Sequence, residues 1–282
     1  PGYATSPGGK GANQALAAAR AGAAVRMVGR VGLDPFAAPA LAALEAAGVD
    51  LSATRRGETA TGCAIVCVED SGENLIVVAA GANGAVSADQ VPDAWLRPGT
   101  VLLLQMEVPH AENWRLVERA RRSGARILLN VAPSAPVPEV ALMALSWLVV
   151  NESEALAVAR GLGWAGSDPL AAAEAIAAAG GVATVVTLGR DGAAAFAAGE
   201  AWRVGALPID PVDTTGAGDA FVGVFAAAMA EGADLPASLR RASVAAGLAC
   251  LVPGAQPSLP DAGAVAARLP QLPPPAPLRA RR

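Results

Sequence analysis

Short apolar runs alternate with alanine-rich segments, and this alternation constrains the fold more than any other feature of the chain. The apolar runs are residues 24–29, 100–105, 126–131, 147–150 and 183–188. Segments of helical composition lie between or beside them, at 11–22, 36–48, 111–124 and 168–181. Continuous apolar strands separated by helices are typical of a parallel sheet with both faces covered. The sequence therefore predicts an α/β fold around a mostly parallel sheet.

One segment, residues 61–83, breaks this alternation. It holds two strand-like runs joined by the turn "EDSGEN", with no helical segment between them. This pattern predicts a β-hairpin. A hairpin that projects from an α/β body can serve as a lid over a site, or can simply extend the edge of a sheet. The sequence leaves both interpretations open.

Charge and composition exclude several classes of protein. The 282 residues carry a formal net charge of −4, which argues against a general nucleic-acid binder. No long uncharged apolar stretch and no signal peptide is evident, so we expect a cytoplasmic protein without membrane contact. The 3 cysteines are too few and too scattered for a disulfide framework or a zinc site. We expect them to be small core residues.

The stretch "DTTGAGDAF" at 213–221 leads from a glycine-rich turn into an apolar run. Such a turn predicts a helix N-terminus, where unpaired backbone N–H groups and the helix dipole favour an anion such as phosphate. The carboxylate of Asp219 would lie beside that anion without being needed to bind it. We therefore interpret Asp219 as a base.

The stretch "GGKGANQ" at 8–14 is a second glycine-rich turn, but it matches neither the P-loop nor the dinucleotide-binding pattern. It presents Lys10 and Asn13 at the start of a helix, where they could hold hydroxyl groups or a phosphate. A plain helix start explains it equally well. In "QMEVP", Glu107 follows a predicted strand, where ligands of α/β sheets bind, although a solvated loop acid is an equal alternative.

The stretch "NESE" at 151–154 directly follows another predicted strand. Asn151 and Glu154 share one face of the first helical turn, and oxygen ligands near a phosphate suit Mg²⁺ held largely through water. A capping box made by the same two residues is a competing and compatible interpretation.

Together these motifs resemble the ribokinase family of sugar kinases, also called the phosphofructokinase-B family. The N-terminal "GGKGANQALAAARAGA" and the C-terminal "DTTGAGDAFVG" resemble the two signatures of that family. The stretches "AGANGAVS", "LLLQMEVP", "VVNESEA", "VTLGRDG" and "GAQPSLP" follow in the order the family has them, up to about residue 260. The resemblance implies a three-layer ribokinase-like fold with a small β-sheet lid.

The resemblance also implies roles for individual residues in sugar binding and catalysis. It implies that Asp219 takes a proton from the primary hydroxyl of the sugar. The γ-phosphate is then expected in an anion hole made by Gly216, Ala217 and Gly218. The sugar-binding positions implied are Gly9, Lys10, Gly11, Asn13, Glu107 and Asp219.

ATP, Mg²⁺ and K⁺ are the cofactors that the resemblance implies. The nucleotide-binding positions are Asn151, Thr187, Leu188, Gly189, Arg190, Asp191, Gly192, Gly218, Asp219 and Ser243. Glu154 is expected to help place Mg²⁺ through water. The positions implied for K⁺, largely through backbone carbonyls, are Asp213, Thr215, Ala249, Val252, Gly254 and Ser258.

By resemblance, residues 1–58 and 84–260 are expected to form the body and 59–83 a hairpin lid, to which 1–8 could contribute. A C-terminal helix and a Pro-rich, extended or disordered tail would occupy 261–282. The implied activity is ATP-dependent phosphorylation of D-ribose to ribose 5-phosphate, in a homodimer paired through the lid. The alternatives are a kinase for another pentose, a deoxy sugar or a nucleoside, and an inactive sugar- or nucleotide-binding protein. A nicotinamide oxidoreductase is a more distant alternative.

The start of the chain departs from the family pattern. The family begins with a β-strand and an Asn/Asp motif whose Asp holds sugar hydroxyls, whereas this chain opens at "PGYATSPGGKG". Loss of a buried parallel strand would leave backbone groups of its neighbours unpaired. The departure leads us to expect either a longer natural chain or a form that binds sugar poorly.

Overall fold

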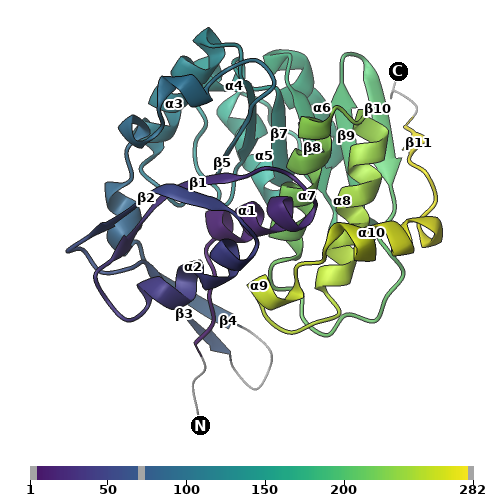
Figure 1. The fold of residues 1–282 in the computed structure, drawn as a ribbon. Helices are drawn as coiled ribbons and strands as arrows, with labels where there is room; N and C mark the ends of the chain where they lie inside the picture. Colours follow the sequence, from purple (N-terminus) through teal and green to yellow (C-terminus); the bar gives the residue numbers. More distant parts are fainter. Residues whose placement is uncertain (1–4, 69–73, 279–282) are drawn as a thin grey trace.

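The central element of the computed structural model, which describes residues 5–68 and 74–278, is a sheet of 7 strands in the order β11-β10-β9-β8-β7-β6-β5 (Figure 1). Strands β5 to β8 run parallel, while β9, β10 and β11 add antiparallel neighbours at one side. The strands are β5 Val101–Leu104, β6 Arg126–Asn130, β7 Trp147–Asn151, β8 Ala183–Thr187, β9 Ala193–Ala197, β10 Glu200–Val204 and β11 Ala276–Pro277.

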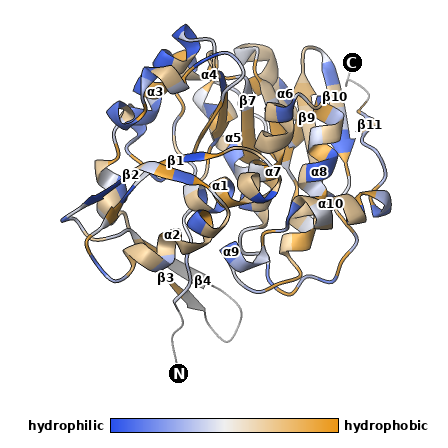
Figure 2. Ribbon diagram, viewed as in Figure 1, coloured by the Kyte–Doolittle hydropathy of each residue, from blue (hydrophilic) through white to orange (hydrophobic). Residues whose placement is uncertain are grey.

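Helices cover both faces of this sheet, which gives the fold its three layers. Side chains of β6 alternate between the two cores: Ile127 and Leu129 face α3 to α6, and Leu128 faces α7 and α8. Figure 2 shows hydrophobic residues along the central strands and hydrophilic residues on α3. The helices are α1 Lys10–Arg20, α2 Ala37–Ala46, α3 His110–Arg122, α4 Glu139–Leu142, α5 Glu152–Gly161, α6 Pro169–Gly180, α7 Ala217–Glu231, α8 Leu235–Ala249, α9 Ala255–Ser258 and α10 Ala262–Arg268.

The predicted α/β class is confirmed, and the apolar runs became strands within a few residues of their expected limits. The expected run 126–131, for example, is β6. Four strands were not predicted, among them the two-residue β11, which lies in the segment expected to be an extended or disordered tail. Strand β2, Asp50–Gly57, is largely polar, and β9 and β10 carry alanines or charged residues instead of a continuous apolar run.

Two further pairs of strands lie outside the main sheet. Strand β1, Arg26–Gly32, pairs with β2 in parallel, while β3, Cys63–Val68, pairs with β4, Asn74–Ala79, as an antiparallel hairpin. The hairpin prediction is confirmed, although its turn lies outside the described residues. Two consecutive residues of β3, which point to opposite faces of the hairpin, are both open to solvent, with Ile65 60% and Val66 53% exposed.

The expectation that the cysteines are core residues is wrong for Cys63. It is exposed, because β3 projects from the body and packs against β4 alone among the strands. Cys250 is half-buried at the end of α8, and burial raises the pKa of its thiol.

The C-terminal segment contains α10 and the short 3₁₀ helix Leu269–Gln271 before it becomes extended. After α10 it reaches the edge of the main sheet, where Trp202 of β10 pairs with Pro277 of β11, and Leu278 N donates to Ala201 O at 2.7 Å. Within the described ranges, each helix is too short or too polar to cross a lipid bilayer.

Helices α1 and α7 cross in direct backbone contact. A Cβ atom added to Gly223 of α7 would lie 2.5 Å from Gln14 O and 2.6 Å from Ala17 Cβ, both on α1. No other residue type fits this crossing without a shift of one helix. Asn13 of α1 and Asp219 of α7 are both close to the crossing point.

We predict that Gly223→Ala lowers the stability of the protein by about 1–3 kcal/mol, because the added methyl group overpacks the crossing. The loss corresponds to roughly 2–4 °C in the unfolding midpoint per kcal/mol, which calorimetry measures. Gly161→Ala, at an exposed helix end with no atom within 4 Å of the new Cβ, is the matched control. It should leave the midpoint unchanged or raise it. Equal midpoints for the two variants would contradict the packing argument.

Candidate active site

The start of α1 meets the carboxylate that follows β5. The backbone N–H of Lys10 donates to Glu107 Oε2 at 2.8 Å. Gly9 adopts a φ of 93°, and a Cβ there would lie 3.9 Å from the same oxygen. On the other side of the turn, a Cβ on Gly11 would approach Gln105 Oε1 to 3.1 Å. The "GGKGANQ" and "QMEVP" stretches therefore form one surface.

Asp219 in the first turn of α7 is joined to α1. Asn13 Nδ2 donates to Asp219 Oδ2 at 2.8 Å, across 206 residues of sequence. Both side chains are buried, with 5% of Asn13 and 8% of Asp219 exposed. Asn13 Oδ1 has no hydrogen-bond partner although it is buried. A buried acceptor without a partner is costly, so this oxygen suits a hydroxyl donor from a ligand.

Other amide side chains join this cluster that sequence reasoning missed. Gln14 Nε2 donates to Asp219 Oδ1 at 2.8 Å and to Asn130 Oδ1 at 2.9 Å. Gln105 Nε2 donates to Gln14 Oε1 at 2.6 Å. Gln14 and Gln105 lay inside the motifs already singled out, whereas Asn130 had only its position at the end of a predicted strand.

The first turn of α5 contains a complete capping box. Asn151 Oδ1 accepts from Glu154 N, and Glu154 Oε2 accepts from Asn151 N, both at 2.8 Å. The capping interpretation of "NESE" is therefore confirmed. Burial raises the pKa of Glu154, and the backbone hydrogen bond from Asn151 and the positive charge of Lys10 partly oppose this. The charge of Lys10 thus connects the "NESE" turn with the "GGKGANQ" turn.

The loop after β8 lies beside Asn151. Thr187 pairs with Asn151 across the parallel strands β7 and β8, so both side chains stand at the carboxyl end of the sheet. The short 3₁₀ helix Gly189–Asp191 follows, and it carries the candidates Leu188, Gly189, Arg190 and Asp191 at or beside it. Gly192 closes the turn with a φ of 87°.

Ser243 is held differently from the other nucleotide candidates. It is 4% exposed on α8, and its hydroxyl donates to Gly205 O at 2.6 Å. This contact ties it to the segment after β10 and not to a residue of the four motifs.

The glycine-rich turn before α7 is shaped by Gly216. Its φ of 81° belongs to the left-handed region, and a Cβ there would lie 3.0 Å from Ala255 Cα. No side chain caps the helix at this residue. The N–H of Ala217 donates to Thr214 O at 3.2 Å within the turn, and the helix N-terminus that begins there suits an anion. The turn packs directly against α9.

Asp213 holds this turn to the loop between α8 and α9. Its Oδ2 accepts from Gly254 N at 2.8 Å and its Oδ1 from Thr215 N at 2.9 Å. These bonds, the one from Gly254 first, lower the pKa of Asp213. The other members of the predicted K⁺ set lie in this loop or at its two ends. Ala249 is buried at the end of α8, Val252 is 43% exposed in the loop, and Ser258 is buried in α9.

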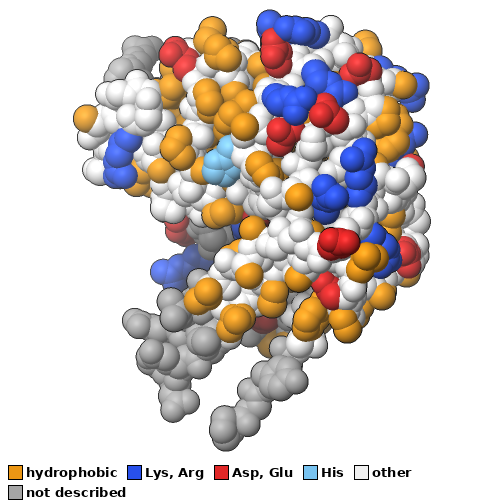
Figure 3. All heavy atoms as spheres, turned by 90° about the vertical axis from the view of Figure 1, so that its left-hand side faces the viewer, with side chains coloured by type: hydrophobic (Ala, Val, Ile, Leu, Met, Phe, Trp, Pro, Cys, Tyr) orange, Lys and Arg blue, Asp and Glu red, His pale blue; other side chains and the backbone are white. Residues whose placement is uncertain are grey.

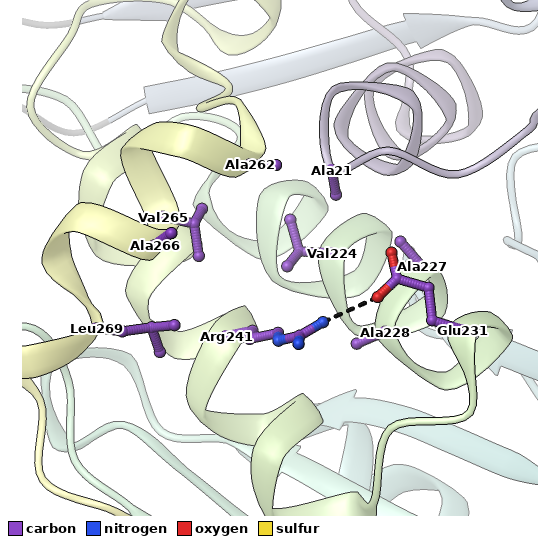
Figure 4. A pocket seen from close by; sticks show the side chains of 10 residues that line it. All are labelled: Ala21, Val224, Ala227, Ala228, Glu231, Arg241, Ala262, Val265, Ala266 and Leu269. Carbon is purple, nitrogen blue, oxygen red and sulfur yellow. Dashed lines mark hydrogen bonds and ion pairs between the residues drawn. The ribbon is translucent and has the colours of Figure 1, made fainter.

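A separate pocket of about 280 Å³ lies between α1, α7, α8 and α10 (Figure 4). Its walls are mainly alanine and valine side chains, and its charged residues Arg241 and Glu231 pair with each other at 2.9 Å. Glu231 ends α7, roughly 18 Å along the helix from Asp219 at 1.5 Å per residue. This pocket is therefore distinct from the cluster around Asp219.

The charges on the face that carries α3 are mixed. Figure 3 shows basic side chains next to acidic ones. Arg115 pairs with Asp89 at 2.9 Å and with Glu112 at 2.8 Å, and Arg119 pairs with Asp93 at 2.5 Å. Paired charges of this kind do not form a continuous basic surface.

Comparison with known proteins gives the same result as the motifs. Residues 1–262 match the family described as pfkB family carbohydrate kinase. The ribokinase of Schizosaccharomyces pombe is 35% identical over 276 residues, covering 92% of this chain and 85% of its own. A deoxyribokinase of Salmonella typhi is 31% identical over 266 residues, covering 93% and 87%. The structure of Arabidopsis thaliana ribokinase complexed with ribose and ATP is 33% identical, with a TM-score of 0.84, and covers 93% of this chain and 87% of that one. This chain belongs to the pfkB family of carbohydrate kinases.

Proposed function

We propose that the chain transfers the γ-phosphoryl group of ATP to the primary hydroxyl of D-ribose, giving ribose 5-phosphate. The contact between Asn13 and Asp219 carries the proposal, because it joins the candidate sugar helix to a carboxylate beside an uncapped helix N-terminus. The relatives named ribokinase, one of them solved with ribose and ATP, support the choice of substrates.

In this proposal Asp219 is the general base. It takes the proton from the sugar hydroxyl while a new bond forms between that oxygen and the γ-phosphorus. The bond from the γ-phosphorus to the bridging oxygen breaks, and ADP leaves. The backbone N–H groups of Gly216, Ala217 and Gly218 would bind the phosphoryl oxygens, where charge has to be stabilised.

The sugar is proposed to lie against the start of α1. Asn13 Oδ1 would accept from one hydroxyl, and Glu107 and Lys10 would hold others, with Gly9 and Gly11 leaving room for them. Sugar hydroxyl groups suit such a surface, because a hydroxyl can donate a hydrogen bond to an otherwise unpaired buried acceptor such as Asn13 Oδ1.

The nucleotide is proposed to lie along the carboxyl ends of β7 and β8. Asn151, the 187–192 loop and Ser243 would contact it, as well as Gly218 and Asp219. Glu154 has one oxygen committed to the capping box, and its other oxygen could hold a water ligand of Mg²⁺. Bound Mg²⁺ would neutralise charge on the phosphates.

We propose a K⁺ site in the loop between α8 and α9. In the described ranges no three His, Cys, Asp or Glu side chains gather as metal ligands, so such a site would use mainly backbone carbonyls. The set is Asp213, Thr215, Ala249, Val252, Gly254 and Ser258. Arg20 of α1 holds α9, which follows this loop, since its Nη1 donates to Gln256 O and Leu259 O at 3.0 and 2.6 Å.

The β3–β4 hairpin is proposed as a lid of residues 59–83 on a body formed by the rest of the chain up to 260, with 261–282 as a C-terminal extension. Asp34 anchors its base: Oδ2 accepts from Thr61 N at 2.6 Å, and Oδ1 from Thr61 Oγ1 at 2.9 Å. Val77 and Val78 of β4 are 54% and 65% exposed. Apolar residues on both faces of a hairpin would be covered by the sugar site on one side and a second copy of the chain on the other. We therefore propose a homodimer, in the cytoplasm where ATP is supplied.

A deoxy sugar is the second candidate substrate, because one relative is a deoxyribokinase. A panel of ribose, 2-deoxyribose, other pentoses and nucleosides with ATP distinguishes the candidates. Higher kcat/KM for any other acceptor than for ribose would overturn the choice of ribose.

We predict that Asp219→Asn lowers kcat by roughly 10²–10⁴-fold, the usual contribution of a positioned base, while ATP binding is retained. A coupled ADP-release assay and nucleotide titration measure the two quantities. Asp210→Asn, an exposed acid shortly before the turn, is the matched control and should keep full activity. An unchanged rate in Asp219→Asn would remove this residue as the base.

We also predict a pH-dependent stability difference for Glu154→Gln. Burial raises the pKa of Glu154 above its ordinary value of 4.5. The contribution of Glu154 to the stability of the folded parent is therefore fully present below that value, and it is lost as the pH rises through the raised pKa. Gln can still complete the capping box but does not titrate. The unfolding midpoint of the variant should therefore rise relative to that of the parent as the pH increases from below 4.5 through the raised pKa of Glu154.

The same variant should lose kinase activity, because the oxygen proposed for the Mg²⁺ water would become an amide. Glu152→Gln removes an exposed charge on the same helical turn and should remain active. Full activity of Glu154→Gln would contradict the metal role, and a constant midpoint difference would contradict the raised pKa.

A further inference from the structure

Gln14 connects Asp219 to the ends of two strands of the main sheet. Its side chain is 0% exposed, and all its polar atoms have partners. One Nε2 hydrogen is directed to Asp219 Oδ1 and the other to Asn130 Oδ1, while Oε1 accepts from Gln105 Nε2. Asn130 ends β6 and Gln105 directly follows β5. An amide chain therefore runs from the sheet to the carboxylate.

The direction of this chain is fixed by the backbone. Asn130 Nδ2 donates to Val149 O at 3.1 Å, and a carbonyl oxygen can only accept. The side-chain oxygen of Asn130 must therefore face Gln14, and Gln14 Nε2 must donate the hydrogen bond to it. The same nitrogen of Gln14 also faces Asp219. With the amide orientation that satisfies the network, Gln14 therefore donates a hydrogen bond to Asp219 Oδ1.

This fixed direction leaves both oxygens of Asp219 as acceptors of side-chain N–H groups. Oδ1 accepts from Gln14 Nε2 and Oδ2 accepts from Asn13 Nδ2, each at 2.8 Å, so the two bonds together fix the orientation of the carboxylate. The donor to Oδ2 is Asn13, whose own Oδ1 is buried without a partner and is suited to a ligand hydroxyl beside the carboxylate. Hydrogen bonds in such a chain also polarise one another toward the charged end.

We propose that Gln14 is a positioning residue, which holds the Asp219 carboxylate in the orientation in which it receives the proton of the sugar hydroxyl. The proposal rests on the proposed function, and it extends that function to a residue that does not touch the substrate. Gln14 acts through Asp219, and Asn130 and Gln105 act through Gln14.

The test is a double-mutant cycle with Gln14→Met and Asp219→Asn. Met fills a similar volume without donating hydrogen bonds. In the parent background kcat should fall about 10–100-fold, with KM for ribose and for ATP within about threefold. In the Asp219→Asn background the same change should lower the residual rate by less than about twofold, because the carboxylate it positions is absent. Unfolding midpoints are measured for each variant.

Gln14→Glu separates hydrogen-bond donation from packing. Glu has the shape of Gln but places a second carboxylate against Asp219, so its kcat should fall further than that of Gln14→Met. Gln105→Met removes only the outer link and should lower kcat by about two- to fivefold, since the contact with Asp219 stays.

Each outcome is decisive. No ribose phosphorylation by the parent, or an unchanged rate in Asp219→Asn, would reject the proposed function itself. An active parent and an impaired Asp219→Asn, together with a Gln14→Met rate within twofold of the parent, would overturn the positioning role. An equal loss in both backgrounds would overturn it too, because packing damage does not depend on Asp219. If Gln14→Met does not fold, the cycle is run with Gln105→Met, where an Asp219-dependent loss supports the proposal and an unchanged kcat overturns it.

Discussion

The backbone contact between α1 and α7 is the constraint on which the candidate active site depends. Gly223 lets the two helices approach until a Cβ atom no longer fits between them. At that separation Asn13 and Gln14, which are consecutive on α1, each reach one oxygen of Asp219. A wider crossing would leave the carboxylate without these donors. The position of the acid is therefore set by helix packing before any ligand binds.

Three acids at the carboxyl end of the sheet are held in different ways, and their environments assign them different tasks. Asp213 accepts backbone hydrogen bonds on both oxygens, which lowers its pKa and makes it a fixed link between two loops. Glu154 is buried in a capping box, and burial raises its pKa. Among the described residues, Asp219 accepts hydrogen bonds from the neutral amides of Asn13 and Gln14. Amides orient a carboxylate without neutralising it, which suits the base that we propose Asp219 to be.

The sequence predicted the parts of the structure that depend on local pattern. Buried parallel strands such as β6 and β7 have continuous apolar runs, so their limits were found within a few residues. Strand β9, with the sequence "AAAFA", has the composition of a helix and becomes a strand only because β8 and β10 pair with it. The role of Gln14 was missed for a related reason. An amide has no motif of its own, and its partner Asp219 lies 205 residues away.

In the proposed reaction, the sugar and the transferred phosphoryl group are bound by different helices. The candidate sugar residues stand at the start of α1, and the candidate phosphate turn stands at the start of α7. The distance between the attacking hydroxyl and the phosphorus is then governed by how these helices pack, and rates of positioned reactions depend steeply on that distance. Small residues at the crossing and buried amides beside it give a rigid spacing without a salt bridge. Precision at the reacting atoms thus follows from close packing in the core, which links the alanine- and glycine-rich sequence of both helices to catalysis.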